Sequence, residues 1–136
     1  MSEPDSRRRI LVVEDELLIA LDLAAMIGEL GHEVVGPVAR VAQAIGLAKR
    51  ERLDAAILDV QLRGGERSYP VADWLISHGV PVVFCTAYGD EGLDAAYAAC
   101  SLLRKPFANA QVGAALARVL PGGRAGGGEN PPPIVR

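Results

Sequence analysis

The sequence predicts a doubly wound α/β fold of the (βα)5 type, because three of its features agree. Short apolar runs rich in β-branched residues alternate with longer segments of helical periodicity, the pattern of a parallel sheet covered by helices on both faces. Half of the 136 residues are hydrophobic, so the chain can bury a core. Polar residues directly follow the apolar runs, and parallel strands bring such residues to one edge of a sheet.

The N-terminal half predicts two strand–helix units. Residues 9–15, RILVVED, form an apolar run that ends on acids and are expected to be a strand buried on both faces. Apolar residues then recur with helical spacing from residue 16 to residue 30, and Gly31 is placed to end that helix. A second strand at residues 32–38 and a second helix at residues 41–50 complete this half.

The C-terminal half predicts three further strands, each followed by a helix. Pro70 suits the first turn of one of these helices, and Asn109 is expected to cap the last. The strands are expected at residues 53–59, 80–86 and 100–105, and the helices at residues 69–78, within 87–99 and at 109–120.

Composition limits the kind of partner that the chain is expected to bind. The formal net charge of −3 and the 4% of aromatic residues do not favour nucleic acid, which needs a basic face and stacking platforms. No apolar run has the length of a signal peptide or a membrane span, so we expect a cytoplasmic protein with no membrane partner. Cys85 and Cys100 lie in apolar contexts and are expected to be free thiols.

One domain is expected, at residues 7–120. The remaining residues, 121–136, are rich in glycine and proline and carry little that could pack. We expect this tail to be disordered.

Polar residues at the carboxyl ends of the predicted strands form the candidate site. Ligands of open α/β sheets bind at this edge, and residues from separate segments meet there only in the folded chain. The candidates are Glu14, Asp15 and Glu16 after the first predicted strand, Asp59 after the third, Thr86 after the fourth and Lys105 after the fifth.

Each candidate also has an ordinary structural explanation. Asp59 would serve as a turn former at a strand end, Asp15 as a helix cap, and Lys105 as a solvated strand end. Together, at one edge of one sheet, they favour a functional site.

The acids of this edge predict a bound divalent cation. Two like charges 4 Å apart repel by roughly 4 kcal/mol at an intermediate dielectric constant, and one lysine cannot balance several carboxylates. An all-oxygen site of this kind suits Mg²⁺. A carboxylate beside Mg²⁺ can act as the nucleophile of a phosphoryl transfer, while a hydroxyl and an ammonium hold the transferred group.

Four segments, ILVVEDE, AAILDV, VVFCTA and LLRKPF, resemble the characteristic motifs of response-regulator receiver domains. The resemblance covers about residues 9 to 120. It implies a flavodoxin-like, five-stranded parallel sheet in the order 2-1-3-4-5, with a phosphoacceptor aspartate after the third strand. Asp59 stands at that position.

The resemblance also implies the ligands of the cation. Glu14 and Asp15 match the acidic pair that helps to hold Mg²⁺. Asp59 and the backbone carbonyl of Gln61 would complete the metal site.

Two further residues are implied to contact the phosphoryl group. Thr86 matches the hydroxyl that turns toward it, and Lys105 matches the lysine that stabilises its charge. The family usually has a cis peptide bond before the next residue, here Pro106.

The function implied is that of a single-domain response regulator in a two-component system or phosphorelay. The phosphodonor would be a phosphohistidine on a histidine kinase or a histidine phosphotransfer protein. The signal would pass on by binding of a downstream protein effector or by onward phosphotransfer. No enzymatic activity is expected beyond self-phosphorylation and slow self-dephosphorylation.

The sequence departs from the family pattern at several positions. Arg63 stands where many receivers have proline, and Leu102 where many have an aromatic switch residue. The segment between Thr86 and Lys105 is short for the family, so its helix is expected to be short or mobile, and Tyr88 is a candidate to cover the site. FCTAYG is loosely similar to the Phe-x-Thr-Gly pattern of a stand-alone receiver subgroup.

Three alternatives remain at this point. The chain would also fit a receiver taken from a longer regulator. An aspartyl-nucleophile phosphatase of the haloacid dehalogenase type would need a second acid two residues after Asp59, where Gln61 stands. A flavodoxin-like nucleotide binder would need a glycine-rich loop after the first strand, where the acids stand.

Overall fold

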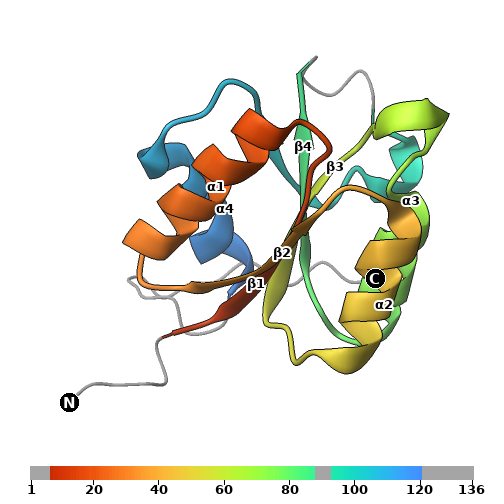
Figure 1. Cartoon of the computed structure of the whole chain (residues 1–136), viewed down its shortest axis with the longest axis horizontal. Coiled ribbons are helices and arrows are strands. Elements are labelled where there is room, and N and C mark those ends of the chain that lie inside the picture. Colours follow the sequence, from red (N-terminus) through yellow and green to blue (C-terminus); the bar gives the residue numbers. More distant parts are fainter. Residues whose placement is uncertain (1–6, 88–92, 121–136) are drawn as a thin grey trace.

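A five-stranded parallel sheet with the strand order β2-β1-β3-β4-β5 forms the centre of the molecule, as the computed structural model shows (Figure 1). The structure describes residues 7–87 and 93–120. The parallel sheet and its strand order confirm the predicted fold class and topology. The strands are β1 (Arg9–Val13), β2 (Glu33–Val38), β3 (Ala55–Asp59), β4 (Val82–Thr86) and β5 (Ser101–Arg104).

Four α-helices cover the two faces of this sheet in the described residues. Figure 1 shows α1 and α4 on one face and α2 and α3 on the other. Their bounds are α1 (Leu17–Glu29), α2 (Val41–Arg50), α3 (Tyr69–Ser77) and α4 (Asn109–Val119), and two short 3₁₀ turns, η2 (Arg63–Gly65) and η3 (Ala95–Tyr97), complete the list.

The helix expected within residues 87–99 is the largest difference from the prediction. In the described part of that segment there is only the three-residue turn η3. Residues 88–92, and with them the proposed covering residue Tyr88, lie outside the described residues, as does the tail from residue 121.

The core consists of two apolar layers, because successive strand residues point to opposite faces of the sheet. In β1, Leu11 and Val13 pack with the layer under α2 and α3, whereas Ile10 and Val12 pack with the layer under α1 and α4. Strands β3 and β4 are buried on both faces along their whole length. Cys85 belongs to the second layer, Cys100 is half-buried, and both are free thiols.

Two helix ends show how local sequence sets the boundaries. Helix α1 ends at Glu29, and Gly31, whose φ is +91° and whose N–H bonds to the Gly28 carbonyl, completes a glycine-based C-terminal cap. Helix α4 begins after Ala108, so the expected cap at Asn109 is wrong. The Gln111 side chain instead accepts the Ala108 N–H at 2.8 Å, and Asn109 donates its side-chain N–H to Glu29 on α1.

Gly36 in β2 is predicted to be intolerant of a side chain. Its φ is +99°, and a Cβ there would meet the backbone nitrogen of Val38 at 3.0 Å and the backbone oxygen of Val12 at 3.1 Å. We expect Gly36→Ala to lower the free energy of unfolding by about 1–2 kcal/mol, measured by urea denaturation. Gly28→Ala is the matched control: space is free around this helical residue, so the change should be neutral or stabilising. Equal effects of the two substitutions would contradict the steric argument.

Candidate functional site

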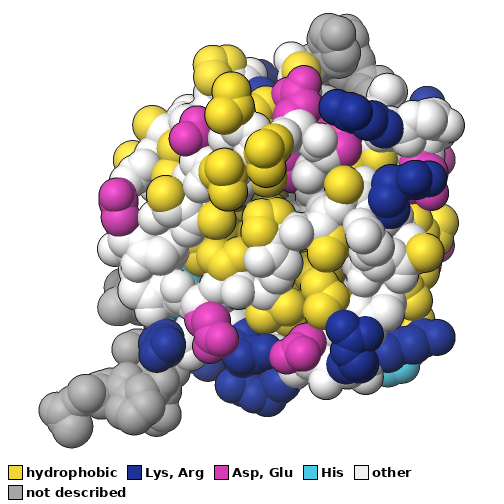
Figure 2. All heavy atoms as spheres, viewed as in Figure 1, with side chains coloured by type: hydrophobic (Ala, Val, Ile, Leu, Met, Phe, Trp, Pro, Cys, Tyr) yellow, Lys and Arg dark blue, Asp and Glu magenta, His cyan; other side chains and the backbone are white. Residues whose placement is uncertain are grey.

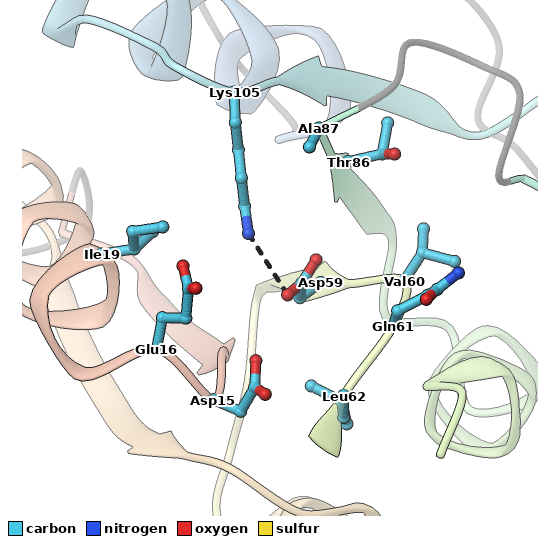
Figure 3. A pocket seen from close by; sticks show the side chains of 10 residues that line it. All are labelled: Asp15, Glu16, Ile19, Asp59, Val60, Gln61, Leu62, Thr86, Ala87 and Lys105. Atoms are coloured by element: carbon cyan, nitrogen blue, oxygen red, sulfur yellow. Dashed lines mark hydrogen bonds and ion pairs between the residues drawn. The ribbon is translucent and has the colours of Figure 1, made fainter. Parts of the chain in front are cut away.

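A pocket of about 450 Å³ opens at the carboxyl edge of the sheet, where the strand-end residues were expected to meet (Figure 3). Four strands contribute to it, because parallel strands all end at this edge. Its lining consists of Asp15, Glu16, Ile19, Asp59, Val60, Gln61, Leu62, Thr86, Ala87 and Lys105.

Asp59 occupies the centre of the site as the last residue of β3. Strand β3 pairs with β1 as far as Leu58 and with β4 through Asp59, so the strand that leads to this carboxylate is held on both sides. The residue is 8% exposed. Its Oδ2 lies 3.3 Å from the Lys105 Nζ, and Figure 3 shows the lysine reaching down from the end of β5 to meet it.

Glu14 and Asp15 follow the same strand, β1, but take different places. Glu14 is buried behind the pocket, where its Oε1 lies 3.1 Å from Lys105 and its Oε2 accepts the backbone N–H of Glu16 at 3.1 Å. Asp15 lines the pocket itself.

The carboxylates of Glu14, Asp15 and Asp59 each place one oxygen so that the three oxygens lie within 4.8 Å of one another. Oxygen ligands of this kind are those that Mg²⁺ prefers. The residues present therefore fit the expected cation in both chemistry and spacing.

Burial and the neighbouring charges shift the pKa values of Asp59 and Lys105. Burial, and after it the negative charge of Glu14, raises the pKa of Asp59 from its ordinary 3.8 to about 7, although Lys105 acts in the opposite direction. Burial lowers the pKa of the Lys105 ammonium, but the charges of Asp59 and Glu14 outweigh it and leave that pKa above its ordinary value. The lysine therefore stays positively charged at neutral pH, and a nearby cation would favour the ionised form of Asp59.

Thr86 and Gln61 are also brought to the pocket. Thr86 ends β4, is 5% exposed, and accepts the backbone N–H of Lys105 on its carbonyl at 2.9 Å. Gln61 lines the wall two residues after Asp59 and forms a backbone bridge with Arg67. The peptide bond between Lys105 and Pro106 is cis, as the resemblance implies.

An aromatic cluster beside β4 was not expected from the sequence. Tyr69 of α3 and Tyr97 of η3 stack with ring centroids 4.5 Å apart, and Phe84 meets both rings edge-on. The Tyr97 hydroxyl donates to Asp73 on α3. Leu102, at the position without an aromatic residue, pairs in register with Phe84 and packs against the same layer. The rings of this region thus come from α3, β4 and η3 rather than from β5.

The contact of Arg63 with Asp15 was also not predicted from the sequence. The Arg63 Nε lies 3.5 Å from the Oδ2 of Asp15. The one available signal was that an arginine replaces the usual proline near an acidic site. A contact across 48 positions of sequence depends on the fold and cannot be read from local pattern.

Fold and site together define a class: an α/β module with a buried aspartate at the end of its central strand and an acidic, cation-suited pocket around it. Among the described residues, no helix combines the length and the apolar character that a bilayer span requires.

Comparison with known proteins specifies the family. The model of the response regulator receiver domain matches residues 10–117, and the chain belongs to this family, which acts in two-component signalling. The chain is 37% identical over 119 residues to the phyllosphere-induced regulator PhyR of Methylorubrum extorquens, an alignment that covers 85% of this chain and 45% of PhyR. It spans about half the length of the curated relatives that it matches.

Solved structures of similar proteins share this fold. The solution structure of SdrG from Sphingomonas melonis Fr1 matches with a TM-score of 0.76 and 43% identity, covering 86% of this chain and 97% of the SdrG chain. The solution structure of the BeF3-activated conformation of SdrG from Pseudomonas melonis Fr1 matches with a TM-score of 0.71 and 44% identity, covering 80% and 92% of the two chains.

Proposed function

We propose that this receiver domain accepts a phosphoryl group on Asp59 in a Mg²⁺-dependent reaction. The observation that carries the proposal is the placement of Asp59: a buried carboxylate on the central strand, with Lys105 at 3.3 Å and the carboxylates of Glu14 and Asp15 close by. An ion pair that served only to stabilise the fold would not need Asp15 as a further acid in the wall of an open pocket.

The chemical step is a transfer of the phosphoryl group from nitrogen to oxygen. A carboxylate oxygen of Asp59 attacks the phosphorus of a phosphohistidine, a P–O bond forms, the P–N bond breaks, and the imidazole leaves with the electron pair. The Lys105 ammonium would bind the oxygens of the transferred group, and the Thr86 hydroxyl would donate to one of them. The product is an acyl phosphate.

The residues that would hold the cation are Asp15, Asp59 and Glu14, together with the backbone carbonyl of Gln61. When bound, Mg²⁺ supplies positive charge that lowers the repulsion between these carboxylates and the incoming phosphoryl oxygens.

The donor is proposed to be a protein, either a histidine kinase or a histidine phosphotransfer protein. The beginning of α1, next to the pocket wall, exposes Leu17, Leu18 and Leu21 at 69%, 76% and 52%. Figure 2 shows hydrophobic side chains gathered over this part of the molecule. An exposed apolar patch beside a reactive site is typical of a protein-docking surface.

The signal is proposed to pass on by binding of a protein effector or by onward transfer of the phosphoryl group. The domain would do so alone or as part of a longer regulator, in the cytoplasm and without contact to nucleic acid. It would have no enzymatic activity beyond its own phosphorylation and slow dephosphorylation.

Mass spectrometry after incubation with acetyl phosphate and Mg²⁺ tests this function. We expect a mass gain of one phosphoryl group, loss of that gain on treatment with hydroxylamine, and no gain when EDTA replaces Mg²⁺. Asp59→Asn should abolish the gain, whereas Asp22→Asn, on the exposed side of α1, should leave it intact. Phosphorylation of the Asp59→Asn variant, or none of the wild-type protein, would contradict the proposal.

A further inference from the structure

Arg63 lies at the mouth of the site and pairs with a carboxylate that the cation would also use. Its Nε is 3.5 Å from the Oδ2 of Asp15. The arginine side chain is 70% exposed and that of Asp15 only 12% exposed. The guanidinium therefore approaches the site from the solvent side.

The backbone around Arg63 is fixed rather than loose. Leu62, directly before it, is 5% exposed and donates its N–H to the Glu66 carbonyl at 2.8 Å. Gln61 and Arg67 close the same loop with an antiparallel bridge. Gly64 and Gly65 have φ values of +74° and +80°, which allow the turn between these contacts. The loop thus holds the Cα of Arg63 where its side chain can reach Asp15.

The charges of the site divide between two cationic side chains. Lys105 pairs with Glu14 and Asp59, on the inner side of the cluster. Arg63 pairs with Asp15, on the outer side. Each acid of the expected metal site therefore has a basic partner from the chain itself.

We propose that Arg63 competes with the divalent cation for Asp15 and thereby raises the Mg²⁺ concentration that the site needs. This inference rests on the proposed Mg²⁺ site and adds a residue that regulates it. A cation bound at Asp15 must share the carboxylate with the guanidinium or displace it, and it is repelled by the guanidinium charge in either case. Because Arg63 is exposed, solvent and salt screen much of this repulsion, so the effect is expected to be modest.

Calorimetric titration of the full chain with MgCl2 at low ionic strength tests the inference without any phosphorylation. We expect Arg63→Gln to bind Mg²⁺ about two- to fivefold more tightly than the wild type, the range of an exposed ion pair. The gain should shrink at high salt. Arg63→Lys keeps the positive charge and should bind with an affinity between those of the wild type and Arg63→Gln.

Arg67→Gln is the matched control, since it removes a positive charge from the same loop at a residue that contacts Gln61 through its backbone. Its Mg²⁺ affinity should stay close to that of the wild type. An Arg63→Gln affinity equal to or weaker than the wild-type value would overturn the inference, the weaker value showing that Arg63 orients Asp15 for the cation. If the wild-type protein binds no Mg²⁺ at all, the proposed metal site itself is wrong.

Discussion

The substitution Asp59→Asn is expected to raise the free energy of unfolding of the metal-free protein by about 2–4 kcal/mol at pH 8. The pKa of Asp59 is raised to about 7 in the folded chain, mainly by burial, and is close to its ordinary 3.8 in the unfolded chain. Between these values the folded state holds a proton that the unfolded state has released. The contribution of Asp59 to the free energy of unfolding therefore falls as the pH rises from about 4 to about 7.

Asp59→Asn removes that titration, so its advantage over the wild type should grow through the same pH window and level off above it. Thermal or urea unfolding in EDTA at a series of pH values measures this difference. The loss of the ion pair with Lys105 reduces the gain, and Glu14 remains as a partner of the lysine. Asp22→Asn, an exposed control, should show no such growth. A difference between Asp59→Asn and wild type that does not depend on pH would contradict a burial-raised pKa.

Saturation with Mg²⁺ is expected to raise the free energy of unfolding of the wild-type protein by about 2.7 kcal/mol at 100 times the dissociation constant. The reason is that the cation relieves the repulsion among Glu14, Asp15 and Asp59, whose oxygens lie within 4.8 Å of one another. The measurement is the melting temperature as a function of MgCl2 concentration at constant ionic strength.

Asp15→Asn should remove most of this gain, because Asp15 is a member of the carboxylate cluster and, unlike Glu14, lines the pocket. Asp22→Asn should retain all of it. The same rise in melting temperature with NaCl, or with Asp15→Asn, would show that general screening rather than a metal site causes the stabilisation.

The fold and the position of the site could be predicted from the sequence because both follow from short-range pattern. The alternation of apolar strands with amphipathic helices requires a parallel sheet. In such a sheet the residue after each strand reaches the same edge, and Asp59, Thr86 and Lys105 meet there as expected.

The features that escaped prediction depend on contacts between distant segments. No local signal says that Glu14 turns inward to Lys105 while Asp15 faces the pocket, since the two are adjacent acids. The stack of Tyr69 on Tyr97 depends on how the segment after residue 92 lies against α3. The cap of α4 was misassigned because the Gln111 side chain, and not that of Asn109, meets the free backbone N–H of Ala108.

The pairing of β3 on both sides has a mechanical consequence for signalling. Strand β3 is paired with β1 as far as Leu58 and with β4 through Asp59 itself, so the backbone that carries this carboxylate can shift only if that pairing is disturbed. A phosphoryl group on Asp59 would therefore sit on a constrained strand, and we expect its effect to appear in the other residues of the pocket wall. Among the described residues, Asp15 and Glu16 after β1 and Ala87 after β4 belong to that wall.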